Sequence, residues 1–167
     1  MKIEMSLNAS SIDKAIRKLR RYETQIERNV QQLLDRMVAD GEDYAVNQLG
    51  HVDTGETLAS IIGYRDGNTG FIVAGGAAVW IEFGTGVYRN QGGQPHPMAS
   101  ALGMSEWGTY GSGHGNNPDG QYWYYPDDSA PGGFSRTRGI EMNPFLYDTA
   151  QALRNQVYAR AREVFRR

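Results

Sequence analysis

At 167 residues the chain is long enough for one domain with a hydrophobic core and one long insertion. Hydrophobic residues make up 40% and charged residues 22%, which excludes a fully disordered chain, and a net charge of -2 gives no overall attraction to nucleic acid or to an anionic membrane. No apolar run has the roughly 18 residues of a membrane span, and the lack of cysteine excludes disulfides and thiolate metal sites.

The N-terminal part of the chain predicts a short strand followed by a long helix. Apolar and polar residues alternate from Met1 to Asn8, a period of two that is typical of a half-buried strand. Ser10 is the expected N-cap, and apolar residues then recur every three, four or seven positions, with no proline before Leu49. Such a helix would be roughly 60 Å long, with Gly41 as the expected place for a kink or break. Its length favours projection toward a partner.

Gly50 is expected to end this helix, and the stretch HVDTGETLASIIGY follows with two interpretations. In an active site, His51 would be a metal ligand or base and Asp53 its orienting partner. In a structural turn, Asp53 would cap the segment TGETLA, Gly55 would allow a tight turn and Glu56 would complete a capping box. The structural turn is favoured, because the spacing around His51 matches no metal-binding motif.

The next two segments predict a β-hairpin and a short element of ambiguous type. Residues 58–75 contain two apolar arms joined by RDGNTG, which holds an Asp-Gly turn signal. The following AAVWIEFGTG fits either a helix or a strand, and Glu82 is the lone carboxylate in it. Glu82 could be a buried general acid. The favoured interpretation exposes its side chain or bonds it to the backbone of the turn at 84–86.

Residues 89–138 predict a long loop insertion, folded back on the domain or ordered against a partner. They contain ten of the 21 glycines, five of the six prolines and no lysine. His96 and His114 lie here and, with His51, Asp53 and Glu82, could converge on zinc only through folding that the sequence does not show. The aromatic residues of the insertion could stack on sugars or form an interface. The candidate interface residues are Trp107, Tyr122, Trp123, Tyr124 and Tyr125.

The C-terminal segment NPFLYDTAQALRNQVYARAREVFRR predicts a second helix with Asn143 as cap and Pro144 in the first turn. Its other face is basic, which is favourable near a helix C-terminus and could also contact DNA. The expected apolar stripe comprises Leu146, Ala150, Leu153, Val157, Ala161 and Val164. The fold class is therefore α+β: a single domain over 1–167, with the N- and C-terminal helices packed on a small antiparallel sheet with a hairpin, plus the insertion at 89–138.

The order of three motifs resembles the tailed-bacteriophage neck or tail-completion family, the minor tail components that join heads to tails. In that family a D-T-G-x-L-x-x-S-I turn follows the first helix, an E-F-G-T segment follows the hairpin, and P-F-L starts the last helix. This sequence departs from the first motif in one of two ways: Leu58 matches the leucine after one extra residue, or Thr57 takes the leucine's place. Ala59 stands where a basic residue is common in the family. The matching residues are Asp53, Thr54, Gly55, Leu58, Ser60 and Ile61, then Glu82, Phe83, Gly84 and Thr85, then Pro144, Phe145 and Leu146.

The resemblance implies a structural virion protein with no catalytic residues, metal or cofactor. Such a protein forms a ring, sixfold, between the head connector or head-closure proteins and the tail tube or tail terminator. In isolation it either self-associates or stays monomeric until a partner templates it. It assembles in the host cytoplasm and resides in the virion neck, where DNA passes without specific binding and no membrane is involved.

Two other functions remain open from the residues alone. One is a metal-dependent hydrolase that uses His51, Asp53, Glu82 and a histidine of the insertion. The other is a carbohydrate-binding module built on the aromatic insertion.

Overall fold

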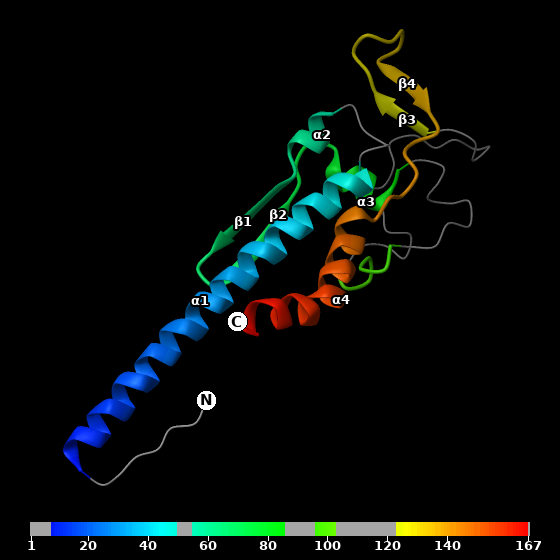
Figure 1. Cartoon of the computed structure of the whole chain (residues 1–167). Helices are drawn as coiled ribbons and strands as arrows, with labels where there is room; N and C mark the ends of the chain where they lie inside the picture. The colour runs from blue at the N-terminus through cyan, green and yellow to red at the C-terminus, as the bar shows by residue number, and fades with distance from the viewer. Residues whose placement is uncertain (1–7, 50–54, 86–95, 103–122, 167) are drawn as a thin grey trace.

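One long helix, α1 (Ala9–Leu49), forms the axis of the molecule, and the other helices and strands lie beside or beyond its C-terminal half (Figure 1). The amide of Ser11 donates a hydrogen bond of 2.9 Å to Oδ1 of Asn8, so Asn8 caps the helix and the prediction of Ser10 as N-cap is wrong. The computed structural model describes residues 8–49, 55–85, 96–102 and 123–166; residues 1–7 of the predicted first strand and Gly50 lie outside this range.

Gly41 does not interrupt α1, contrary to the sequence-based prediction. A Cβ atom at this position would lie 2.9 Å from Cδ1 of Leu153 and 3.0 Å from Cδ1 of Ile72. The glycine therefore provides space where other elements approach the helix from two sides. Packing against these neighbours compensates for the low intrinsic helix propensity of glycine.

The predicted hairpin is confirmed with shorter arms. Strand β1 (Ile62–Asp66) pairs antiparallel with β2 (Thr69–Val73) across a two-residue turn. Gly67, the first turn residue, has a φ of 55°, which favours glycine. Residues 58–61 do not belong to the first arm, because a short helix, α2 (Glu56–Ala59), and the turn after it occupy this part of the chain.

The hairpin lies with its glycines against α1. A Cβ atom on Gly63 or Gly70 would approach the side chain of Val38 to 2.8 or 2.7 Å, so larger residues would separate the hairpin from the helix. The amide of Gly63 also donates to Oε2 of Glu42 at 3.0 Å. Near the hairpin turn, Arg65 forms an ion pair of 2.7 Å with Asp35 of α1.

Two ambiguous parts of the sequence adopt regular structure. The AAVWIEFGTG segment forms a helix, α3 (Ala78–Phe83), and part of the insertion forms a second hairpin from β3 (Trp123–Pro126) and β4 (Phe134–Thr137). The prediction of a loop over 89–138 is therefore wrong for this hairpin. Its turn is organised by Asp127, whose carboxylate accepts hydrogen bonds from Ser129 and Ser135; these bonds lower the pKa of Asp127.

The last helix, α4 (Phe145–Phe165), packs against α1. Arg160 binds both carboxylate oxygens of Asp40 at 2.7 and 3.1 Å and also contacts Glu163 at 3.3 Å. These bonds raise the pKa of Arg160 above its usual range, and the bonds to Asp40 have the largest effect.

The predicted apolar stripe of α4 is only partly covered, since Val164 is buried whereas Val157 is 42% exposed.

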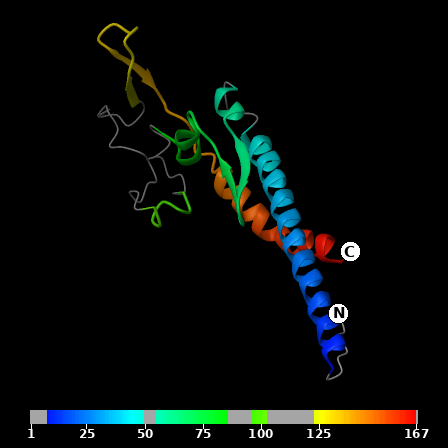
Figure 2. The same ribbon diagram turned by 90° about the vertical axis from the view of Figure 1, so that its left-hand side faces the viewer.

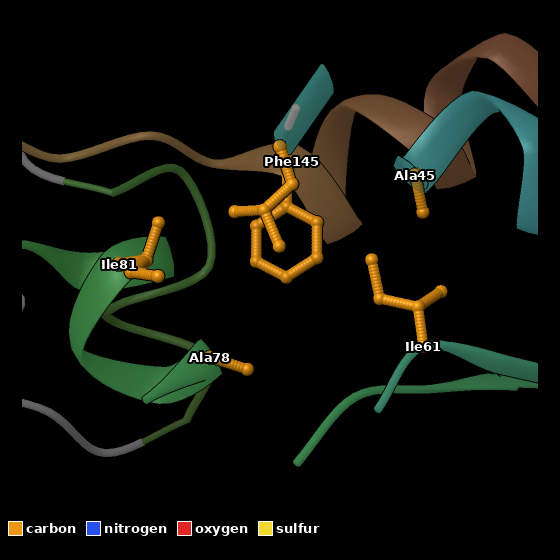
Figure 3. Close-up of a cluster of buried hydrophobic side chains, with 6 residues drawn as sticks. Ala45, Ile61, Ala78, Ile81 and Phe145 are labelled. Carbon is orange, nitrogen blue, oxygen red and sulfur yellow. The ribbon is translucent and has the colours of Figure 1, made fainter. Parts of the chain in front are cut away.

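The core lies where α1, α3 and α4 meet the residue that precedes β1, and the phenyl ring of Phe145 occupies its centre (Figure 3). Its buried residues are Ala45, Leu49, Ile61, Ala78, Ile81 and Phe145. The two long helices and the small antiparallel sheets confirm the predicted α+β class. Within the described residues, no helix combines the length and hydrophobicity needed to span a bilayer.

Candidate functional site

The three motif segments noted in the sequence meet around one buried residue, Phe145 of the PFL segment. Its side chain is fully buried, between Ile81, which directly precedes the EFGT segment, and Ile61, which ends the first motif (Figure 3). Leu58 and Leu146 pack against the same cluster. The site is therefore a junction of segments that are far apart in the sequence.

Glu82 is the central polar group of this junction. Its side chain crosses to the start of α4, where Oε2 accepts the amide of Leu146 at 2.8 Å and Oε1 accepts the amide of Tyr147 at 3.0 Å. A carboxylate at this position satisfies N–H groups that lack a partner within the helix and interacts favourably with the helix dipole. Glu82 is only 5% exposed, so the prediction of an exposed side chain is wrong. The alternative prediction of bonds to the turn at 84–86 includes Gly86, which lies outside the described residues.

His96 covers the other side of the carboxylate. Its Nε2 lies 2.9 Å from Oε1 of Glu82, and its Nδ1 accepts the amide of Met98 at 3.1 Å. Because Nδ1 is an acceptor, the proton of the neutral ring lies on Nε2 and is donated to Glu82. The imidazole is 4% exposed and packs against the rings of Phe83 and Tyr147, with centroids 4.3 and 5.6 Å away.

The rest of the EFGT segment is held by backbone hydrogen bonds to the chain before α4. The amide of Thr85 donates to the carbonyl of Ile140 at 2.8 Å, and the amide of Ile140 donates to Oγ1 of Thr85 at 2.9 Å. Gly84 has a φ of 71° and a ψ of 166°, a conformation that only glycine adopts readily. A Cβ atom there would also lie 2.9 Å from the amide nitrogen of Met142.

The predicted cap of the last helix plays a different role. Pro144 occupies the N-cap position, and its side chain forms no capping hydrogen bond. The side-chain amide of Asn143 instead donates to the carbonyl of Gln48 at 3.2 Å. The amide of Asn143 donates to the carbonyl of Ile81 at 2.8 Å. Asn143 thus ties the entry of α4 to α1 and α3, and Glu82 supplies the capping carboxylate.

The turn of the first motif is stabilised by two hydroxyl groups. Oγ of Ser60 accepts the amide of Gly75 at 2.8 Å, and Oγ1 of Thr57 accepts the amide of Ala77 at 3.3 Å. Gly55 precedes α2 with a φ of 90°, a backbone conformation that favours glycine. The proposed cap from Asp53, with its neighbour Thr54, lies outside the described residues.

The hydrolase residues are only partly placed. Glu82 and His96 come together, whereas His51, Asp53 and His114 lie outside the described residues. Within the described part of the chain, no group of three or more histidine, cysteine, aspartate or glutamate residues could hold a metal ion. The sequence analysis brought Glu82 and a histidine of the insertion together only in a possible zinc site. It did not predict that Glu82 binds both His96 and the start of α4.

The aromatic candidates of the insertion are also only partly placed. Trp107 and Tyr122 lie outside the described residues, whereas Trp123, Tyr124 and Tyr125 form most of β3. The side chain of Tyr124 is 36% exposed.

In comparisons with protein-family models, curated proteins and solved structures, nothing matches this chain. The geometry of the junction is that of a structural element: each polar side chain in it binds backbone groups or another buried side chain.

Proposed function

We propose that this chain is a non-enzymatic structural protein of a phage or prophage virion, located at the head–tail junction. In this role it completes or caps the tail and joins it to the head connector as an oligomeric ring. The observation that supports the proposal is the convergence of the three motif segments on one buried junction, where Glu82 holds the start of α4. The three motifs therefore have a common structural role, which is to form this junction.

The state of the polar residues favours a structural role over hydrolysis. A general acid or a metal ligand needs an atom that can reach a substrate or an ion. Both carboxylate oxygens of Glu82 accept hydrogen bonds within the protein, and both ring nitrogens of His96 have partners. The pair is also buried, which separates it from any substrate in solution.

The surface of the molecule favours a role in assembly. The N-terminal half of α1 projects from the rest of the protein and has exposed apolar side chains (Figure 2). Neighbours in the neck, such as head-closure, tail-tube or tail-terminator proteins, would cover such surfaces. The assembly would form in the host cytoplasm and remain in the virion.

Deletion of the coding region from the phage or prophage that encodes the chain tests this proposal. The expected result, by electron microscopy of lysates, is filled heads and tails that are not joined, with normal particles restored by a plasmid copy of the wild-type gene. A plasmid copy with the exposed Glu141 replaced by alanine should restore joining equally well. Joined, infectious particles from the deletion strain would contradict the proposed function.

A further inference from the structure

Two of the apolar surfaces that stay exposed among the described residues belong to different parts of the chain. The first, here called the helix stripe, runs along the projecting half of α1, and its side chains are 37–51% exposed; it comprises Ile12, Ile16, Leu19, Tyr22 and Ile26. The second, here called the hairpin face, is the side of the β1–β2 hairpin that points away from α1, with exposures of 38–53%; it comprises Ile62, Tyr64, Phe71 and Val73.

The hairpin face follows from the strand register. Ile62 pairs with Val73 and Tyr64 pairs with Phe71, so the four large side chains share one side of the sheet. The rings of Tyr64 and Phe71 are stacked with their centroids 5.0 Å apart. The opposite side, with its glycines, is occupied by α1. A two-stranded sheet that packs its glycines inward and its aromatic residues outward presents a flat binding surface.

The two surfaces cannot cover each other within one chain. The hairpin is packed over Val38, whereas Leu19, in the middle of the helix stripe, lies 19 positions earlier on the same continuous helix. At about 1.5 Å per residue this separation is roughly 28 Å. Figures 1 and 2 show the stripe-bearing half of α1 extending away from the hairpin. Contact between them therefore requires two molecules.

The projecting part of α1 and the rest of the chain carry net charges of opposite sign. Residues 9–28 contain six basic and three acidic residues, whereas residues 29–167 contain ten basic and fifteen acidic ones. By strand alternation, the exposed Asp66 lies on the hairpin face at its tip. A basic helix with an apolar stripe thus matches an apolar face that ends in a carboxylate.

Parallel pairing of the helix stripe with itself is less favourable. In a parallel pair of α1 helices the seam formed by Ile16, Leu19 and Ile26 would include Glu23. Two Glu23 carboxylates would then face each other between the helices, and like charges in such positions are destabilising. A hairpin face without this carboxylate is the better partner.

We propose that the helix stripe of one molecule binds the hairpin face of a second copy in a head-to-tail contact. A contact between two different surfaces of the same chain is heterologous and generates a closed ring when its rotation closes. This contact rests on the proposed assembly role and identifies the surfaces that would build the ring.

Mixing two single-surface variants tests the contact. Leu19→Asp disables the helix stripe and leaves the hairpin face intact, whereas Phe71→Asp does the reverse. Both positions are exposed, so far-UV circular dichroism should show native folding. Val157→Asp on α4, another exposed apolar position outside both surfaces, is the matched control. Masses are measured by native mass spectrometry and light scattering on full-length protein.

The wild type and Val157→Asp are expected to form oligomers of uniform mass at high concentration, and each single-surface variant is expected to remain monomeric. An equimolar mixture of Leu19→Asp and Phe71→Asp is expected to give a dimer and nothing larger, because only one productive contact is left. The proposal is overturned by a wild type that stays monomeric up to its solubility limit, by either variant assembling alone, or by a mixture that stays monomeric.

The phage deletion distinguishes this failure from failure of the proposed function. If a plasmid copy with Phe71→Asp joins heads and tails normally, the head–tail role stands and only the contact is wrong. If the wild-type copy itself is not needed for joining, the function is wrong as well.

Discussion

Replacement of Glu82 by alanine should destabilise the protein strongly, because three donors lose their acceptor at once. They are the amides of Leu146 and Tyr147 and Nε2 of His96. A buried donor without a partner costs about 1–3 kcal/mol. With about 1 kcal/mol for each partly buried amide and about 2 kcal/mol for the buried imidazole, the expected loss is about 4 kcal/mol. This is a large part of the roughly 5–15 kcal/mol that stabilises a typical domain.

Urea and thermal unfolding, followed by far-UV circular dichroism, measure this loss. For a chain of this size, a loss of about 4 kcal/mol lowers Tm by about 8–16 °C. Glu82→Gln should have an intermediate effect, since its one carbonyl oxygen can still accept a helix amide. The control Glu141→Ala removes an exposed carboxylate just before α4 and should change stability by no more than about 0.5 kcal/mol. A loss below about 1 kcal/mol for Glu82→Ala would refute the capping role.

Three further predictions follow from the backbone and from charge. Gly84→Ala should lower the free energy of unfolding in urea by about 2–4 kcal/mol, because it combines a glycine-only conformation with a clash against backbone atoms. Gly55→Ala, at a positive φ with open space around it, should lower it by about 1–2 kcal/mol. Equal losses for the two variants would contradict the role of the clash. Gly63→Val should separate the hairpin from α1 and lower stability by about 1–3 kcal/mol, and unchanged hydrogen-exchange protection of the β1 and β2 amides would argue against it. Asp127 has a lowered pKa in the folded protein, so its contribution to the β3–β4 turn is present above the unfolded value of about 4 and is lost as pH falls through the lower folded value. The NMR shift of the Ser129 amide should titrate below about pH 4 in the wild type and not in Asp127→Asn.

The long helices and the first hairpin could be predicted because their signals are local. Apolar periodicity and a turn containing Gly67 are properties of neighbouring residues, and the folded protein keeps the helices and the hairpin that they predict. Residues 78–83 were ambiguous because a six-residue, mostly apolar segment is too short to separate helix from strand by period. The β3 strand was hidden by the glycine-rich composition around it, although aromatic residues favour strands.

The site could not be derived because its contacts join distant segments. Glu82 and Leu146 are 64 positions apart, and no local pattern identifies the helix that a carboxylate will cap. Gly41 was mistaken for a break because propensity describes an isolated helix, whereas here β2 and α4 pack against it from both sides. The motif residues were identified in order, and their meeting around Phe145 required the fold.

Because α1 is anchored along only one of its halves, the helix acts as a lever. The hairpin and α4 hold its C-terminal half, and about 20 residues extend beyond them over roughly 30 Å (Figure 1). A rotation of about 10° at the held half would therefore displace the far end by about 5 Å, close to one full turn of helix. Small adjustments at the anchored half of α1 would thus be amplified where the helix meets its neighbour.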